Sequence, residues 1–240
     1  FGKASGFNGG KGGSMHIADF SVGMLGANGV VAACLPIAVG AAHAQKLRGT
    51  CGITVCFFGD GAINRGPFLE ALNWAQVYQL PVLFVCEDNR WSATTASGPM
   101  TAGDGASARA EALDIPATQV DGNDAWAVYA AAPTLVDAVR GGSGPRLLLA
   151  VTYRVKGHVS VDLAAYRDPQ ELEAALKTDP IARFATQFTD LGHPAATLDT
   201  IRQQALDEVS AALDTAAAAA WPDASAAYSD IQTTGDGQWF

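Results

Sequence analysis

The amino-acid sequence predicts an α/β fold: a doubly wound parallel sheet flanked by helices, followed by a C-terminal helical extension and tail. Two observations carry this prediction. Short apolar runs alternate with helical stretches over residues 53–153. After His158 the character changes, and residues 169–220 show helical periodicity with breaks at Pro180 and at Gly192-His193-Pro194. The 240 residues are enough for one substantial core. We therefore expect an α/β domain over residues 1–168 and a helical extension with tail over 169–240, packed on that domain.

The N-terminal stretch reads differently from the rest. Residues 2–29 are rich in glycine with little periodicity, which predicts a long irregular segment. An Ala-, Val- and Ile-rich stretch then runs to Leu47 and predicts a buried helix with a kink or a start near Pro36 and an end at Gly49. Because the chain starts with Phe1 rather than Met, we expect an N-terminal part of the natural protein to be missing.

The next elements follow from short apolar runs, which predict strands, and from periodic stretches, which predict helices. The run at 53–58 fits a strand buried on both faces, and the run at 81–86 a second buried strand. In chain order we expect a strand at 53–58, a helix at 64–78, strands at 81–86 and 117–120, a helix at 124–140, a strand at 146–153 and helices over 169–220. A strand–helix–strand unit requires parallel strands that are adjacent or nearly so. From Pro222 onward we expect an extended tail that packs on a partner subunit.

Composition limits the classes of function. The formal net charge is −9, which argues against nucleic acid or an anionic membrane as the main partner. No apolar run is long enough to span a membrane, and we expect no signal peptide in the residues given. The cysteines form no CxxC pair, which indicates reduced thiols in a cytoplasmic protein; they are Cys34, Cys51, Cys56 and Cys86.

The chemistry centres on Asp60 in Gly59-Asp60-Gly61 and on Asn89, each placed where a predicted strand ends. Ligands of open parallel sheets bind outside the carboxyl ends of the strands, so these two residues should be neighbours in space. One carboxylate and one amide oxygen suit Mg²⁺, which completes its octahedron with phosphate oxygens and water. Taken alone, Gly-Asp-Gly is an ordinary turn; the pairing with Asn89 favours a metal–diphosphate site.

These two segments, Phe58 through Asn64 and Cys86 through Trp91, resemble the thiamine-diphosphate motif. More closely, the chain resembles the alpha subunit of the dehydrogenase component of 2-oxo acid dehydrogenase complexes, including their acetoin dehydrogenase relatives. The resemblance covers nearly the whole chain. Its further supporting stretches are 9–16, 26–31, 120–124, 153–158 and 166–167.

The resemblance implies thiamine diphosphate and Mg²⁺ as cofactors and assigns a role to each matching position. The metal ligands would be the side chains of Asp60 and Asn89 and the backbone carbonyl of Trp91. His158 would act in catalysis and acyl transfer from a mobile loop over the diphosphate. The remaining cofactor contacts would be Gly59, Gly61 and Ala62 at the diphosphate and Gly29 and Val31 at the aminopyrimidine.

Three positions depart from the family pattern. Asp88 replaces the first Asn of the usual pair, and Trp91 stands where Tyr is more frequent. The regulatory serine that follows the loop histidine in some members is Val159 here, with Ser160 next, so phosphorylation control is not implied.

The implied function is cleavage of a 2-oxo acid, pyruvate-like or branched, or of acetoin, with transfer of the acyl group to a lipoyl carrier. The implied partners are a beta subunit, which supplies the catalytic Glu of the site, and a lipoyl-bearing acyltransferase. Residues 15–28 are most similar to acetoin-type members. Two alternatives stay open: a catalytically degenerate scaffold with this fold, and, less favoured, a subunit of a two-chain transketolase-like enzyme.

Three further histidines have separate interpretations. His43, in an apolar helix, is expected to be a core or interface residue, and His193, beside a turn proline, to be solvated. For His16, in the glycine-rich segment, a position facing the active site and a purely structural one are equally open.

Overall fold

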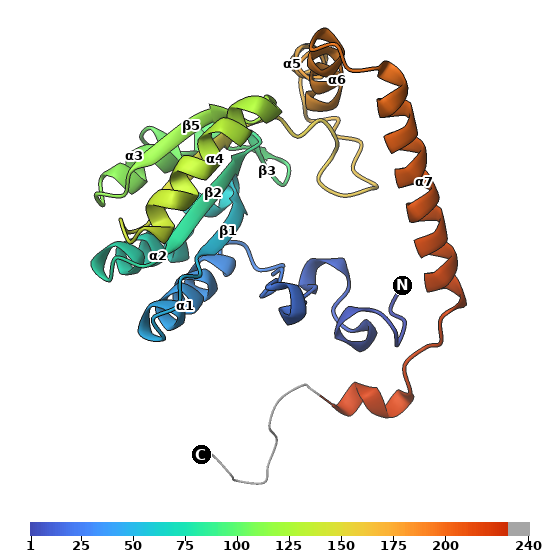
Figure 1. Ribbon diagram of the computed structural model, residues 1–240, viewed down its shortest axis with the longest axis horizontal. Coiled ribbons are helices and arrows are strands. Elements are labelled where there is room, and N and C mark those ends of the chain that lie inside the picture. The colour runs from blue at the N-terminus through green and yellow to red at the C-terminus, as the bar shows by residue number, and fades with distance from the viewer. Residues whose placement is uncertain (230–240) are drawn as a thin grey trace. The chain divides into compact units, whose positions relative to one another are not determined.

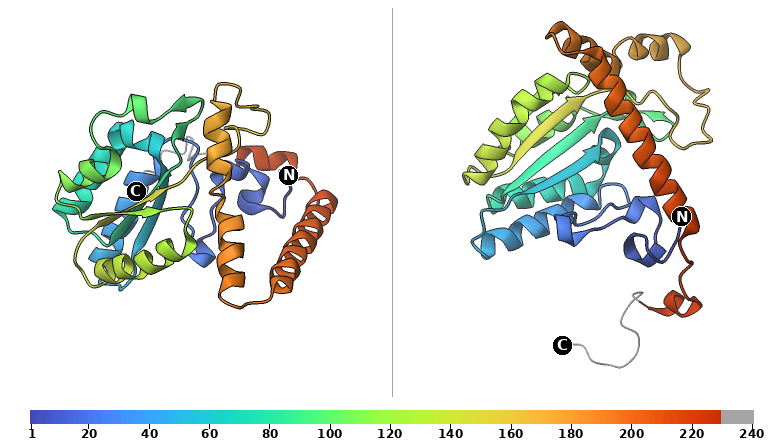
Figure 2. Two further views of the ribbon diagram at one scale, coloured as in Figure 1. Left: turned by 90° about the horizontal axis from the view of Figure 1, so that it is seen from above. Right: turned by 45° about the vertical axis from the view of Figure 1, so that its right-hand side comes forward.

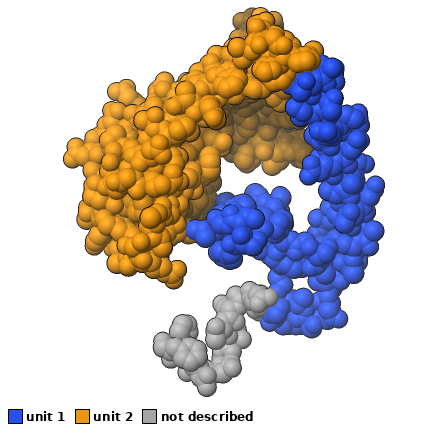
Figure 3. Space-filling view, in the orientation of Figure 1, with its two compact units in different colours: residues 1–29, 196–240 blue, residues 30–195 orange. Residues whose placement is uncertain are grey.

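The structure is a computed structural model that describes residues 1–229. The chain divides into two compact units, residues 30–195 and residues 1–29 with the part that starts at residue 196 (Figure 3). The sheet and all predicted site residues except Gly29 belong to the unit 30–195. The domain boundary expected at residue 168 stays a prediction.

Within the described residues, four parallel strands form the main sheet in the order β1-β2-β6-β5 (Figure 1). All of them follow the apolar runs that predicted strands, and the strands of the first strand–helix–strand unit are direct neighbours, Gly59 lying beside Glu87. The bounds are β1 (Thr54–Gly59), β2 (Val82–Asp88), β5 (Ala117–Asp121) and β6 (Arg146–Val151).

Helices cover both faces of this sheet, as Figure 2 shows in its right-hand view. Three of them pack into one hydrophobic core with the strands: α1 (Cys34–Leu47), α2 (Gly66–Val77) and α3 (Gly105–Glu111). On the opposite face, α4 (Ala125–Arg140) packs on Leu83, Val85 and Leu148. The predicted α/β class with a doubly wound parallel sheet is therefore confirmed.

The two helices beside β1 form because their apolar residues recur with helical spacing. The buried residues are Leu35, Ala38, Val39 and Ala42 in α1 and Phe68, Ala71, Leu72 and Ala75 in α2. Full burial of one Leu or Phe side chain stabilises the fold by about 1.5–3 kcal/mol. Pro36 lies in the first turn of α1, where an amide needs no helical partner, so it marks the start of the helix.

One prediction about the strands is wrong. β2 is buried on both faces over Val82–Cys86, as expected, whereas β1 is buried on one face only. The side chains of Val55 and Phe57 are 40% and 62% exposed. The reason is position: β1 is an edge strand, and α4 packs against β2, β5 and β6 instead.

The rest of the described chain agrees with the sequence in outline. Residues 2–29 contain only short 3-10 turns and one isolated β-bridge. The helices after residue 168 are α5 (Pro169–Leu176), α6 (Pro180–Asp190) and α7 (Ala195–Ala218). The tail expected from Pro222 includes a 3-10 helix, Ala224–Tyr228, and its residues 230–240 lie outside the described part. None of the described helices combines the length and the apolar character needed to cross a membrane.

The sequence did not predict α3 or a short hairpin that follows β2. The hairpin pairs β3 (Trp91–Ser92) with β4 (Thr95–Ala96) in antiparallel register. Two-residue strands leave no periodic signal, so their pattern could not be read from the sequence.

Candidate functional site

The carboxyl ends of two paired parallel strands place Asp60 and Asn89 at one edge of the sheet. Gly59 in β1 pairs with Glu87 in β2, so Asp60 and Asn89 both follow paired strand ends. Asp88 pairs in turn with Val151 of β6. A cavity of about 300 Å³ opens at this edge, and its lining includes Asp60, Asp88, Arg90, Ser97, Gln119 and Val151.

Asp60 is the most buried charged group at this edge, with a side chain 4% exposed. Its Oδ2 accepts a hydrogen bond from the hydroxyl of Ser97, while its Oδ1 is buried and has no hydrogen-bond partner among the described residues. Burial raises the pKa of the Asp60 carboxyl; the Ser97 bond lowers it, and the charge of Asp88 raises it further. A buried carboxylate oxygen without a partner fits a cation ligand.

Asn89 is held by the turn between β2 and the hairpin. Its Oδ1 accepts a hydrogen bond of 3.1 Å from the Trp91 amide. Arg90, between them, has a φ of +71°, a left-handed conformation that is uncommon for a residue with a side chain. The Ser97 amide donates to the Arg90 carbonyl at 3.0 Å, which fixes the far end of the hairpin to the same turn.

The negative charge of Asp88, which replaces the first Asn of the usual pair, is balanced by a neighbouring cation. Its carboxylate lies 3.5 Å from the Arg90 guanidinium and accepts a 3.3 Å hydrogen bond from the Arg90 amide. The extra negative charge therefore has a cation of its own beside the predicted metal ligands.

Gly61 has a packing reason to be glycine. A Cβ on Gly61 would lie 2.3 Å from Ser92 Oγ and 2.8 Å from Ser92 Cβ, closer than real atoms approach. A Cβ on Gly59 would have Glu87 O as its nearest neighbour, at 3.9 Å. The hairpin thus packs directly on the backbone that follows Asp60. Ala62 is buried behind it.

The predicted aminopyrimidine residues occupy the start of the helical layer and the segment before it. Val31 is 56% exposed and precedes Ala32, a buried residue with a φ of +73°. Strained non-glycine residues of this kind concentrate at functional sites. Gly29 packs against His16: a Cβ there would lie 3.2 Å from His16 Nε2. The role of His16 stays a prediction.

His158 lies in the loop between β6 and α5, and its side chain is exposed. The guanidinium of Arg154 lies 3.4 Å from His158 Nδ1; since guanidinium only donates, the imidazole accepts at that nitrogen. The Arg154 amide donates to the Asn89 carbonyl at 3.2 Å. The histidine loop is therefore joined to the same turn as the predicted metal ligands.

Asp162 organises this loop. Its carboxylate accepts hydrogen bonds from the His158 amide at 2.7 Å, the Ala164 amide at 2.8 Å and the Tyr166 hydroxyl at 2.8 Å. These bonds lower the pKa of Asp162 to about 2. Gly157 packs so closely on the Asp162 carbonyl that a Cβ would lie 2.0 Å from it.

Arg167 supports the loop that carries His158, and it is only 6% exposed. Its guanidinium donates to the carbonyls of Arg154 and Lys156 and lies 5.0 Å from the centre of the Trp91 ring. One buried cation therefore joins the histidine loop to the hairpin through both hydrogen bonds and an aromatic face.

Sequence reasoning assigned no role to four residues of this network: Ser97, Arg154, Asp162 and Arg167. Arg154 and Arg167 stand in motifs that supported the resemblance, so a signal existed for them. Ser97 lies in a stretch without periodicity or motif, and only the folded hairpin brings it to Asp60.

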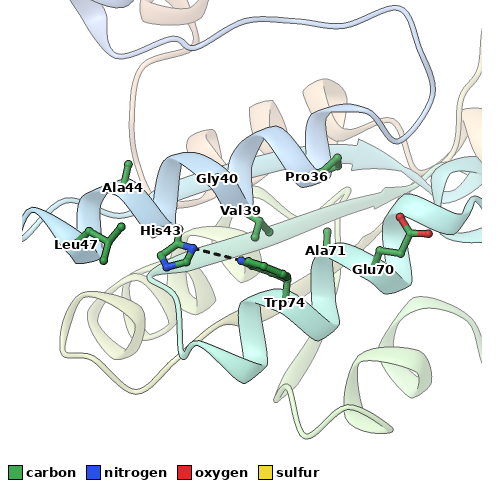
Figure 4. Close-up of a pocket in the computed structure, with 9 residues that line it drawn as sticks. All are labelled: Pro36, Val39, Gly40, His43, Ala44, Leu47, Glu70, Ala71 and Trp74. Carbon is green, nitrogen blue, oxygen red and sulfur yellow. Dashed lines mark hydrogen bonds between the residues drawn. The ribbon is translucent and has the colours of Figure 1, made fainter. Parts of the chain in front are cut away.

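A second hollow, of about 490 Å³, lies between α1 and α2 (Figure 4). Trp74 Nε1 donates to His43 Nδ1 at 3.3 Å across it, and the His43 ring lies 4.9 Å from that of Tyr78. His43 thus has partners on the neighbouring helix, as expected of a core or interface residue. None of the predicted site residues lines this hollow. His193 is exposed, as predicted, and stacks on Phe188 at 4.4 Å.

The side chains at the sheet edge are compatible with a Mg²⁺ site. Among the described residues, no cluster of three or more His, Cys, Asp or Glu side chains is placed to hold a metal. A site with one carboxylate, one amide and one carbonyl is compatible with that, and the unpartnered Asp60 oxygen supplies the position such a site needs. The residues therefore fit a magnesium ion that takes its other ligands from phosphate and water.

Comparison with known proteins gives consistent matches. The family model described as "Dehydrogenase E1 component" matches residues 1–225. The acetoin:2,6-dichlorophenolindophenol oxidoreductase alpha subunit of Bacillus subtilis is 47% identical over 171 residues, 71% of this chain and 51% of that protein. The subunit of the same name from Cupriavidus necator is 42% identical over 92% of this chain and 67% of that protein.

The pyruvate dehydrogenase E1 component alpha subunit of Rhizobium meliloti is 37% identical over 96% of this chain and 67% of that protein. The chain thus spans between half and two thirds of the length of these relatives. Among solved structures, a Mycobacterium smegmatis protein described as "a putative thiamin diphosphate-dependent enzyme" matches 50% of this chain and 22% of that one, at 25% identity and a TM-score of 0.41.

Proposed function

The chain belongs to the dehydrogenase E1 component family, and we propose on that basis that it is the alpha subunit of a thiamine-diphosphate-dependent dehydrogenase. Its reaction is cleavage of a 2-oxo acid or acetoin, followed by transfer of the acyl group to a lipoyl carrier. The observation that carries the proposal is the buried Asp60 carboxylate, with one oxygen unpartnered among the described residues, at the sheet edge where Asn89 follows the end of β2.

In this proposal Mg²⁺ is held by Asp60 and Asn89 through their side chains and by Trp91 through its carbonyl. A magnesium ion held there would offset the cost of burying the Asp60 charge and would neutralise negative charge on the diphosphate. Gly59, Gly61 and Ala62 bring the backbone close to the diphosphate, and Gly29 and Val31 contact the aminopyrimidine. When bound, thiamine diphosphate supplies the nucleophilic carbon that attacks a carbonyl and stabilises the resulting negative charge.

The chain's own residues would then orient and shield this site. The Arg154 amide is anchored to the Asn89 carbonyl, and its guanidinium donates to the Ala93 carbonyl of the hairpin. This places a fixed cation near the proposed diphosphate end. The Arg154 guanidinium also orients the imidazole of His158, because it hydrogen-bonds to Nδ1. Nε2 of the imidazole is therefore left to hold or donate a proton. The Asp162 carboxylate keeps His158 in place by accepting a hydrogen bond from the His158 backbone amide.

The proposed partners are a beta subunit, which supplies the catalytic Glu, and a lipoyl-bearing acyltransferase. A relative named as a subunit alpha supports the first of these. For the substrate we propose acetoin first, because two acetoin-type relatives at 47% and 42% identity exceed the 37% of the pyruvate-type relative described above. A cytoplasmic location also belongs to the proposal; the free state of Cys34, Cys51, Cys56 and Cys86 supports it.

Calorimetric titration of the chain with thiamine diphosphate and Mg²⁺, in the presence of its beta subunit, tests cofactor binding. Asp60→Ala should abolish binding. Asp104→Ala is the matched control, because Asp104 lines the same cavity but belongs to no predicted ligand set, and it should bind like the wild type. Undiminished binding by Asp60→Ala would refute the proposed metal site.

Reduction of 2,6-dichlorophenolindophenol by the reconstituted complex tests the reaction. The assay compares acetoin, pyruvate and branched 2-oxo acids, and the highest kcat/KM is expected for acetoin. A complex that binds the cofactor but reduces no acceptor with any of these substrates would favour the degenerate scaffold alternative.

A further inference from the structure

Two cysteines far apart in the sequence meet between α1 and β1. Cys34 is the first residue of α1, and Cys56 is the third residue of β1. The Cys34 thiol donates a 3.7 Å hydrogen bond to the Phe57 carbonyl, and at the other end of the helix Gln45 accepts a 3.4 Å hydrogen bond from the Thr54 hydroxyl. The helix therefore runs antiparallel to the strand, with its first turn beside the strand's second half.

The side chain of Cys56 points toward this helix. Along β1 the exposed Val55 and Phe57 alternate with buried residues, and Cys56 belongs to the buried set that faces the helical layer. Cys56 is 4% exposed and belongs to the core cluster against which Cys34 packs. The two thiols thus share one side of the strand.

The two thiols differ in environment. Cys34 is partly exposed and begins a helix, where the free backbone amides favour a thiolate. A hydrogen bond from the Cys56 thiol is the largest cause that lowers the pKa of Cys34, to about 7, against the opposing effect of burial. The same bond and burial raise the pKa of Cys56. Near neutral pH a substantial fraction of Cys34 is therefore thiolate, beside the buried thiol of Cys56.

We propose that Cys34 and Cys56 form a peroxide-sensitive thiol pair that closes to a disulfide between α1 and β1. The oxidant is hydrogen peroxide, which is small and uncharged and can therefore reach a partly buried sulfur. The thiolate of Cys34 attacks one peroxide oxygen, the O–O bond breaks, and hydroxide departs, so that Cys34 becomes a sulfenic acid. The hydroxide takes up the proton that the Cys34 thiol had released and becomes water. The Cys56 thiol then attacks that sulfur and its proton leaves with the hydroxyl as water, so two thiols and one peroxide give one disulfide and two waters.

The other two cysteines lack this arrangement and serve as internal controls. Cys51 is exposed and precedes β1. Cys86 is fully buried in β2, where burial and the nearby charges of Asp88 and Asp60 raise its pKa. We expect peroxide to leave Cys86 reduced and to give no intramolecular link through Cys51.

Peptide mass spectrometry under non-reducing conditions tests the pair. Trypsin should release Cys34 in the peptide 12–46, Cys51 and Cys56 together in 49–65, and Cys86 in 66–90. Because 49–65 holds two cysteines, Cys51→Ser makes the assignment unambiguous. After peroxide and iodoacetamide, the 12–46 and 49–65 peptides should appear joined, lighter by two hydrogens than their sum, and should separate on reduction.

A second measurement reads the pair without oxidation. In the Cys51→Ser chain, the rate of iodoacetamide alkylation at Cys34 should reach half its maximum near pH 7. Adding Cys56→Ala should move that midpoint toward the ordinary thiol value of about 8.5. Peroxide should then carry Cys34 to sulfinic acid without a cross-link.

The proposal is overturned if peroxide leaves both peptides alkylated and separate, or oxidises Cys34 to sulfinic acid in the presence of Cys56. An unchanged alkylation midpoint in the folded Cys56→Ala variant would overturn it as well. The cross-link measurement needs no substitution at either cysteine, so it decides the matter even where that variant does not fold.

Discussion

The hydroxyl of Ser97 donates a hydrogen bond to the carboxylate of Asp60, and this buried contact joins residues 37 positions apart. Ser97 directly follows the hairpin strand β4, and Asp60 directly follows β1. The bond orients Asp60 so that Oδ2 is occupied and Oδ1 keeps its lone pairs. The hairpin thus acts as a support for the predicted metal ligand.

Ser97→Ala should lower the free energy of unfolding of the chain by about 1–3 kcal/mol, because a buried carboxylate loses a hydrogen-bond donor. Ser107→Ala is the matched control: the Ser107 hydroxyl is buried without a partner among the described residues, so its removal should be neutral or slightly stabilising. Urea denaturation of both variants measures the difference. Equal stability of the two would contradict a structural role for the Ser97 bond.

Gly61→Ala should destabilise the fold by about 1–3 kcal/mol, because the new Cβ overlaps Ser92 and forces the hairpin to move. Gly59→Ala, in the same motif, has room for its Cβ and should cost less than about 1 kcal/mol. Thermal denaturation followed by circular dichroism compares them. Combining Gly61→Ala with Ser92→Gly should recover part of the loss, and no recovery would mean that the clash lies elsewhere.

Asp162→Asn should loosen the loop that carries His158, because a neutral amide accepts more weakly from the two backbone amides and the tyrosine hydroxyl. Hydrogen exchange at the His158 and Ala164 amides should become faster. Asp168→Asn is the control, since Asp168 caps α5 through Gln170 and should change protection only there. Unchanged exchange at His158 in Asp162→Asn would argue against this organisation of the loop.

The same carboxylate predicts a pH dependence. Its folded pKa of about 2 lies below the ordinary value of 3.8, so its contribution is fully present above the ordinary value and is lost as the pH falls through the folded one. Protection of the His158 amide in the wild type should therefore drop between about pH 4 and pH 2. Asp162→Asn should lack that step, and a step of equal size in the variant would assign it to another group.

Arg183→Met should detach α6 from the end of β5. The Arg183 guanidinium lies 2.6 Å from both Asp121 and Asp124, and its hydrogen bond is the largest cause that lowers the pKa of Asp121. We expect the pKa of Asp121, followed by carboxyl NMR, to rise toward its ordinary value and the denaturation midpoint to fall. Arg140→Met removes only an exposed contact of 3.7 Å to Asp137 and should leave both measurements nearly unchanged.

The sequence by itself determined the class of fold and the approximate course of the main elements. The apolar run before Asp60 and the spacing of Leu35, Ala38 and Val39 are local signals, since a strand repeats every two residues and a helix every 3.6. The position of Asp60 and Asn89 just beyond two paired strand ends was also predictable, because parallel strands place their carboxyl ends at one edge.

Only the tertiary structure decided the rest. It exposed Phe57 on the outer face of β1, brought Ser97 to Asp60, and seated Cys34 against the strand that carries Cys56. These relationships join residues that are distant in the sequence, and no periodicity encodes them. They depend on which strand lies at the edge of the sheet, on where the hairpin turns back and on how closely a helix packs on a strand. These features are fixed only when the whole core forms.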